Sequence, residues 1–156
     1  LALYLRHYLP EAQVCAVELA DTALAYTEAN THGSGVEVIQ ADATAVDTLA
    51  QWNGTVDLIV TNPPYVPESP DLDPEVYHDP HDAVFAGADG MRVITRLIPT
   101  IARLLRPGGK VAIEHDDSTS DAVQAALVHY GGFEQIVPLQ DLTGTPRFVT
   151  AVRGVD

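Results

Sequence analysis

Residues 56–65 read VDLIVTNPPY, a short apolar run that stops abruptly at an amide side chain and two prolines. The run predicts a buried β-strand over residues 56–61. Proline has no backbone N–H and fixes its own φ, so the strand cannot continue through Pro63 and Pro64. The chain is therefore expected to leave the sheet here through a rigid turn, with Asn62 before the prolines and Tyr65 after them.

This turn contains the groups needed to hold a flat, neutral amino group. The side-chain carbonyl of Asn62 and the backbone carbonyl of a proline both accept hydrogen bonds, so together they can bind one –NH2. The ring of Tyr65 can cover the face of the same group. The alternative is that Asn-Pro only starts a turn and that the tyrosine only packs. A buried strand that runs directly into the whole string favours the functional interpretation.

The composition describes one ordinary globular domain. The chain has 156 residues, a hydrophobic content of 46% and a mean hydropathy of +0.04, which is typical of a chain that buries a sizeable core. No apolar run approaches the roughly 18–20 residues that a membrane-spanning helix needs, and residues 1–10 lack the features of a secretory signal. Cys15 is the one cysteine, which excludes an internal disulfide. We therefore expect a cytoplasmic protein.

The net charge of −14 argues against direct binding of nucleic acid. Lysine and arginine are the residues that bind phosphate backbones, and this chain has eight of them against 22 acidic residues. Solubility alone is the alternative explanation of the acidity. Either explanation weighs against DNA as the substrate.

Apolar spacing predicts an alternation of strands and helices. Strands are expected at residues 13–18, 36–40, 56–61, 110–114, 133–139 and 147–153. Helices are expected at residues 1–9, 20–30, 44–52, 91–105 and 121–130, with a turn at 107–109 after the fourth and Ser118 as N-cap of the last. The alternation predicts an α/β fold with a mostly parallel sheet. No helix separates the final two strands, so they are expected to pair antiparallel.

Residues 66–90 form one long irregular segment that contains Pro67, Pro70, Pro74 and Pro80 and is rich in acidic residues. Loops of this length in a compact domain are usually functional or disordered. The position directly after Tyr65 favours a lid that faces the substrate, and the alternative is an acidic insertion without that role.

Four consecutive predicted strands end in polar residues, namely Glu18, Asp42, Asn62 and Glu114. Ligands of open parallel sheets bind outside the carboxyl ends of the strands, so these residues are expected to converge there. Glu18 is placed to accept from ribose hydroxyls and Asp42 from an adenine amino group, with Ala43 leaving room for the base. Each acid alone could instead cap a helix.

Several strings across the chain resemble one family. They are VTNPPYVP (60–67), DP (79–80), AV (83–84), AGADGM (86–91), LRPGG (105–109), IEH (113–115), DLTG (141–144) and PRF (146–148). Together they resemble the release-factor glutamine methyltransferases of the HemK/PrmC type, which are class I S-adenosylmethionine-dependent methyltransferases. The resemblance implies a Rossmann-like fold that binds S-adenosylmethionine and methylates the side-chain amide nitrogen of a glutamine in a peptide-chain release factor.

The same resemblance implies roles for the residues of the turn. Asn62 and the carbonyl of Pro63 would accept from the substrate –NH2, Pro64 would keep the turn rigid, and Tyr65 would pack against the amide. Glu18, Asp42, Ala43 and Asn62 would contact the cofactor. Catalysis would rest on positioning and electrostatics, without a metal and without a covalent intermediate.

The chain departs from the family pattern at its start and at two positions. The family's first strand and glycine-rich loop have no counterpart after Leu1, so residues 1–156 are expected to form a C-terminal catalytic domain that is incomplete at its N-terminus. Loss of that central strand would leave two unpaired inner strand edges and an open cofactor site. The chain alone is therefore expected to bind S-adenosylmethionine weakly or not at all. Asp79 stands where glutamate is more usual, and Asp116 where glycine is expected.

Two other functions remain open on the sequence alone. Methylation of adenine in nucleic acid would use the same Asn-Pro-Pro-Tyr string, and a non-catalytic remnant would only bind a partner. No metal site is expected, because His78, His81 and His115 lack metal-ligand spacing with a cysteine. Cys15 is expected to be a small buried residue of its strand.

Overall fold

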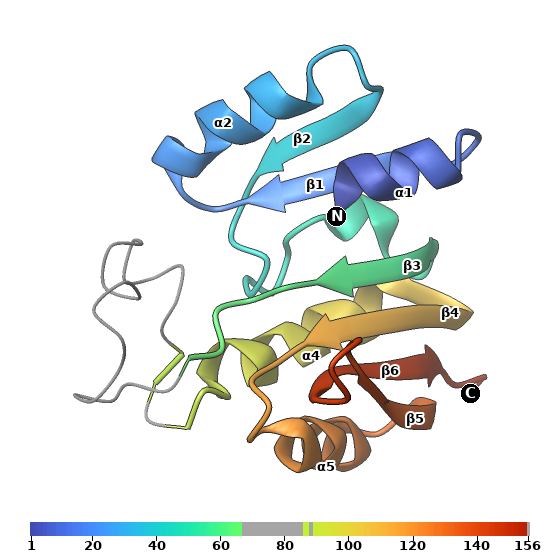
Figure 1. Ribbon diagram of the computed structural model, residues 1–156. Coiled ribbons are helices and arrows are strands. Elements are labelled where there is room, and N and C mark those ends of the chain that lie inside the picture. Colours follow the sequence, from blue (N-terminus) through green and yellow to red (C-terminus); the bar gives the residue numbers. More distant parts are fainter. Residues whose placement is uncertain (67–85, 88, 156) are drawn as a thin grey trace. The chain divides into compact units, whose positions relative to one another are not determined.

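The computed structural model describes residues 1–66, 86–87 and 89–155, and it divides the chain into two compact units, Leu1–Thr48 and Leu49–Asp156 (Figure 1). Most of the irregular segment 66–90 lies outside the described residues. The lid or acidic insertion predicted there, its four prolines, Asp79, His78 and His81 therefore lie outside them as well.

The first unit consists of α1 (Ala2–Tyr8), β1 (Val14–Glu18), α2 (Asp21–Thr31) and β2 (Val36–Gln40). β1 and β2 pair in parallel from Val14–Val36 to Glu18–Gln40, with α2 as the crossover between them. These four elements confirm the predictions for this part of the chain. Because the strands are parallel, Glu18 and the residues that follow Gln40 lie at the same end of the two-stranded sheet.

The segment after β2 corrects one prediction, because residues 44–52 do not form an α-helix. They form turns and one short 3₁₀ helix, η1 (Ala50–Trp52). The Asp42 carboxylate accepts from the backbone N–H of Thr44 at 2.8 Å, and Leu49 has a φ of 57°. Aspartate and threonine side chains compete with the helix for backbone hydrogen bonds, and a left-handed residue interrupts the helix before its last turn.

The second unit consists of β3 (Val56–Thr61), α4 (Arg92–Leu104), β4 (Leu105–Glu114), α5 (Ser120–Tyr130), β5 (Phe133–Gln140) and β6 (Pro146–Arg153). Its sheet has the order β3-β4-β6-β5. β3 and β4 are parallel, and the arrowhead of β6 points opposite to theirs in Figure 1. β6 also pairs antiparallel with β5. The predicted antiparallel pair at the end of the chain is confirmed.

The start of β4 differs from the prediction. Residues 107–109 were expected to form a turn before a strand at 110, but the strand already begins at Leu105. In the β3–β4 ladder Val56 pairs with Leu105 and the next pair is Leu58–Lys110, so the glycine-rich residues form a bulge inside the ladder. A bulge accommodates the extra residues and re-aims the strand. From Lys110 onward the register is regular as far as Thr61–Ile113.

The core of the second unit lies between its sheet and the helices α4 and α5. The largest fully buried side chains are Ile94, Ile98, Val111, Ile113, His115, Val123, Leu127 and Val149. They come from α4 and α5 at a spacing of four residues, from β4 and the residue after it at a spacing of two, and from one position of β6; these are the periods expected of helices and strands. No helix among the described residues is long and apolar enough to span a membrane.

The N-terminus of α5 corrects the predicted cap. Thr119, and not Ser118, is the N-cap residue of the helix. The exposed Ser118 donates from its backbone N–H and its hydroxyl to the Asp116 carboxylate, at 3.0 Å and 2.5 Å. Asp116 competes for the serine hydroxyl, so Ser118 orders the loop between β4 and α5 and leaves the helix end to Thr119.

Among the described residues, β1 and β3 each have a strand partner along one edge only. Among the described residues of the first unit, Val14 is the single buried hydrophobic side chain. The largest fully buried side chains all belong to the second unit. The second unit is therefore the part of the chain with a substantial core.

Candidate active site at the ends of β3 and β4

The Asn-Pro-Pro-Tyr turn lies where the sequence predicts it, directly after the last residue of β3. Residues 62–65 have no regular secondary structure, and the peptide bonds before both prolines are trans. Asn62 is exposed, whereas the next residue, Pro63, is buried. After the turn, the backbone carbonyl of Val66 accepts from the N–H of Ala86 at 3.0 Å. The turn thus has an exposed asparagine directly before a buried proline.

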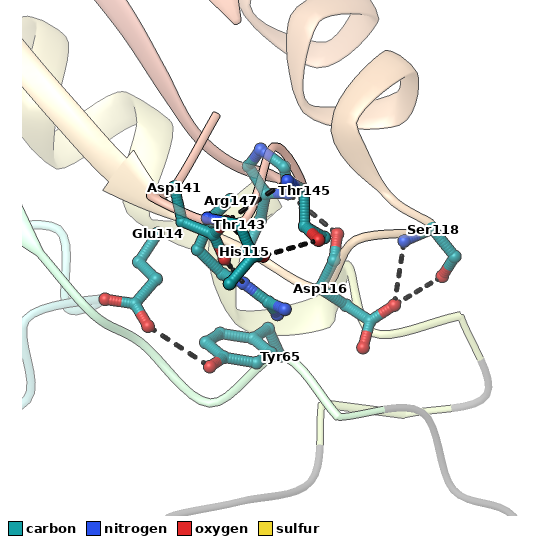
Figure 2. A network of polar contacts seen from close by, with 9 residues as sticks. All are labelled: Tyr65, Glu114, His115, Asp116, Ser118, Asp141, Thr143, Thr145 and Arg147. Atoms are coloured by element: carbon teal, nitrogen blue, oxygen red, sulfur yellow. Dashed lines mark hydrogen bonds and ion pairs between the residues drawn. The ribbon is translucent and has the colours of Figure 1, made fainter. Parts of the chain in front are cut away.

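Tyr65 is tied to the neighbouring strand. Its phenol Oη donates to Oε1 of Glu114, the last residue of β4, at 3.2 Å (Figure 2). Burial raises the pKa of the Tyr65 phenol, and the adjacent Glu114 carboxylate raises it further. The phenol therefore keeps its proton at neutral pH and remains a hydrogen-bond donor. Asn62 and Glu114, which follow the paired residues Thr61 and Ile113, are the two members of the predicted convergence that this unit contains.

Arg147 lies beside this pair, at the start of β6 (Figure 2). Its Nε is 3.8 Å from Oδ2 of Asp141, in the turn between β5 and β6. Hydrogen bonds from Thr143 and Thr145 lower the pKa of Asp141, with Arg147 adding to the effect. The charge of Arg147 also acts on Tyr65, where it opposes the increase of the phenol pKa. The DLTG and PRF strings of the sequence thus build a charged cluster next to the turn.

Asp116 continues this cluster beyond the end of β4. Burial alone would raise its pKa, but the hydrogen bonds from Ser118 outweigh burial and, with Arg147, hold the pKa below its usual value. Asp116 is thus a carboxylate at neutral pH. The glycine expected at this position from the family pattern would have no side chain to accept these bonds.

His115 is a residue of this region whose burial was not predicted from the sequence. Its side chain is fully buried, and Nδ1 lies 2.7 Å from the backbone carbonyl of Asp116, so Nδ1 carries the proton. Its Nε2 has no hydrogen-bond partner in the described part of the chain. The available signal was the alternation of the strand, because His115 follows β4 directly and continues the buried positions Val111 and Ile113 at a spacing of two residues.

Glu18 and Asp42, the predicted cofactor residues, lie at the common end of β1 and β2 in the first unit. Oε1 of Glu18 accepts from the backbone N–H groups of Leu19 and Ala20, both at 2.9 Å, just before α2. Asp42 accepts from Thr44. Neither acid caps an α-helix, which was the alternative to ligand binding: the N-cap of α2 is Ala20, without a side-chain hydrogen bond, and no α-helix begins in the described residues directly after Asp42. Ala43 is half-buried beside Asp42. The convergence of these residues with Asn62 stays a prediction, because the two units are described separately.

Cys15 differs somewhat from its prediction, since its side chain is half-buried rather than fully buried. Burial, followed by the charge of Glu37, raises the pKa of its thiol to about 11. Among the described residues, no three histidine, cysteine or acidic side chains are grouped to hold a metal ion.

The family model of the methyltransferase small domain matches residues 1–79. A release factor glutamine methyltransferase of Mycolicibacterium smegmatis is 52% identical over 98% of this chain, and one of Corynebacterium glutamicum is 53% identical over 97%. The matches cover 55% of each of these proteins, so the chain spans about half the length of the curated relatives it matches.

Solved structures of methyltransferases resemble the chain in fold at low sequence identity. A methyltransferase from Pyrococcus furiosus has a TM-score of 0.69 and 18% identity, over 97% of this chain and 68% of that one. A predicted O-methyltransferase from Agrobacterium tumefaciens has a TM-score of 0.66 and 18% identity, over 98% and 68%. The predicted Rossmann-like α/β fold and the family resemblance are confirmed: the chain belongs to the methyltransferase small domain family.

Proposed function

We propose that this chain is the catalytic part of an S-adenosylmethionine-dependent methyltransferase that methylates a glutamine side-chain amide in a peptide-chain release factor. The observation that carries the proposal is the turn after β3, where an exposed Asn62 is followed by a buried Pro63. The names of the relatives that are 52–53% identical support the choice of substrate. Such a substrate would place the protein in the cytoplasm, as the sequence predicts.

The turn would act by holding and orienting the substrate amide. Asn62 Oδ1 and the backbone carbonyl of Pro63 would each accept from one N–H of the –NH2 group, which increases electron density on the nitrogen. The amide nitrogen is a poor nucleophile, so its alignment with the methyl donor matters more than usual. Pro64 restricts the backbone of the turn, and the ring of Tyr65 would cover the amide plane.

The acidic residues of the first unit fit the hydroxyl and amino groups of the cofactor, which supplies an electrophilic sulfonium methyl group when bound. Glu18 has a carboxylate whose orientation is set by two backbone N–H groups, and carboxylates at strand ends accept from ribose hydroxyls in this class of fold. Asp42, with Ala43 beside it, would accept from the adenine amino group. These cofactor contacts, and the assignment of residues 1–156 to one catalytic domain, are part of the same proposal.

The test is transfer of a tritiated methyl group from S-adenosylmethionine to a purified release factor. Two proteins are assayed. One is the 156-residue chain, and the other, called the completed protein, adds to it those residues of the Mycolicibacterium smegmatis relative that lie outside the match. We expect labelling of the release factor by the completed protein and loss of at least about two orders of magnitude on Asn62→Ala, because one of two acceptors is removed from a transition state that depends on them.

The controls separate the proposal from its alternatives. Asn30→Ala changes an exposed asparagine of α2 and should leave activity unchanged. A release factor whose acceptor glutamine is replaced by alanine should not be labelled. Labelling of duplex DNA in preference to the release factor would overturn the proposal in favour of adenine methylation. Full activity of Asn62→Ala, or no activity of the completed protein on any substrate, would overturn the enzymatic reading of the turn.

A further inference from the structure

The hydrogen bond between Tyr65 and Glu114 joins two residues 49 positions apart, at the ends of two adjacent strands. From this contact we infer that Glu114 is a positioning residue, whose carboxylate holds the ring of Tyr65 in the orientation that the substrate amide requires. The inference deepens the proposed function and rests on it for the identity of the substrate. The contact itself does not depend on that function.

The position of Glu114 suits such a role because the residue is held by strands on both sides. The preceding residue Ile113 pairs with Thr61 of β3, and Glu114 itself pairs with Phe148 of β6. Groups carried on regular elements are placed more reproducibly than groups on loops. Tyr65, in contrast, lies in a stretch without regular structure. Glu114 therefore gives the turn a fixed point that its own backbone lacks.

The bond restricts the motion of the ring directly. A tyrosine side chain held only at Cβ can vary about χ1 and about a broad χ2 well. Anchoring the far end of the ring through Oη limits both rotations at once. The ring is proposed to cover a substrate amide that Asn62 and Pro63 bind. The tilt of the ring therefore determines whether the amide contacts its face or its edge.

The charges around the phenol indicate that the anchor persists at neutral pH. Glu114 and Asp116 are the carboxylates that act on Tyr65, and Arg147 is the opposing cation. Together with burial, the carboxylates prevail and the phenol retains its proton. A tyrosinate could not donate to Glu114, so the anchor would be lost only at alkaline pH.

The first test is a titration of the Tyr65 phenol in the 156-residue chain, which needs no enzymatic activity. Protein labelled with ¹³C at tyrosine Cζ gives one signal per tyrosine, and Tyr65→Phe identifies the signal of interest. We expect Glu114→Gln, which keeps the shape of the side chain and removes its charge, to shift the titration of Tyr65 to lower pH. Asp121→Asn, an exposed acid on α5, should leave it unchanged. A Tyr65 titration that does not respond to Glu114→Gln overturns the inference.

The second test uses the completed protein in the methyl-transfer assay. Glu114→Ala and Tyr65→Phe should each lower kcat about tenfold, the effect of losing one partly exposed hydrogen bond to a charged group. The KM for S-adenosylmethionine should not change, and the double substitution should be no slower than either single one. Glu114→Gln should recover part of the rate, because its amide oxygen still accepts from the phenol.

The two tests distinguish failure of this inference from failure of the proposed function. Absence of methyl transfer by every variant, with an intact response of Tyr65 to Glu114→Gln, would reject the function and leave the contact established. The positioning role would be rejected if the double substitution lowered kcat by the product of the two single effects, since the two residues would then act independently.

Discussion

Replacing Gly109 by alanine should destabilise the β3–β4 bulge. An added Cβ would lie 2.8 Å from the backbone oxygen of Val56 and 2.9 Å from that of Arg106, where ordinary contact begins near 3.4 Å. Both neighbours are backbone atoms, so they cannot move aside as a flexible side chain would. Overpacking of this kind costs about 1–3 kcal/mol, offset by roughly 0.4–1 kcal/mol from the lower entropy of the unfolded chain.

We therefore expect Gly109→Ala to lower the free energy of unfolding by about 1–2 kcal/mol. For a unit of this size that corresponds to a Tm lower by roughly 5–10 °C. Thermal unfolding followed by circular dichroism measures the loss, and hydrogen exchange of the β3 amides locates it. Lys110→Ala, at the next and exposed position of the same strand, is the control. A Gly109→Ala protein as stable as the parent would show that the two backbones do not approach closely at the bulge.

Three further outcomes are expected. Leu127→Ala, at a fully buried position of α5, should lower the free energy of unfolding in urea by about 3 kcal/mol, whereas Val128→Ala, at an exposed position, should change it little. Asp116→Asn should reduce stability above about pH 4, the range in which the carboxylate of Asp116 is charged in the folded and the unfolded chain. Because the pKa of Asp116 is lowered in the folded chain, the difference in stability from the parent should disappear as the pH falls through that folded pKa. Cys15 should react slowly with iodoacetamide at pH 8 and approach half its limiting rate only near pH 11; fast reaction at pH 8 would contradict the buried environment.

Most elements of the fold follow from local patterns in the sequence. The strands expected at residues 56–61 and 147–153 and the helix expected at 91–105 lie close to β3, β6 and α4. The failures occur where side chains compete with the backbone. Residues 44–52 are apolar enough for a helix, but Asp42 and Thr44 form a turn, and Asp116 likewise takes the hydroxyl of Ser118 away from the end of α5.

The turn at residues 62–65 was predictable from the sequence, but its contact with β4 was not. Asn62 to Tyr65 are contiguous, so the prolines alone indicate the exit from β3. The partner of Tyr65 is 49 residues away, and only the register of β3 against β4 brings Glu114 to it. That register includes a bulge whose length the glycines at 108 and 109 do not specify. The burial of His115 depends in the same way on which face of β4 turns inward.

The long separation between Tyr65 and Glu114 also bears on the order in which the chain folds. The β5–β6 hairpin closes a loop over residues 141–145, whereas β3 and β4 must close one over residues 62–104. With a closure entropy that grows with the logarithm of loop length, the longer loop costs about 2 kcal/mol more. Local pairings form sooner than distant ones, so the hairpin is expected early and the β3–β4 pair late. A nascent chain would then acquire an ordered amide-binding turn only in the last stage of folding, after most of its β-structure is in place.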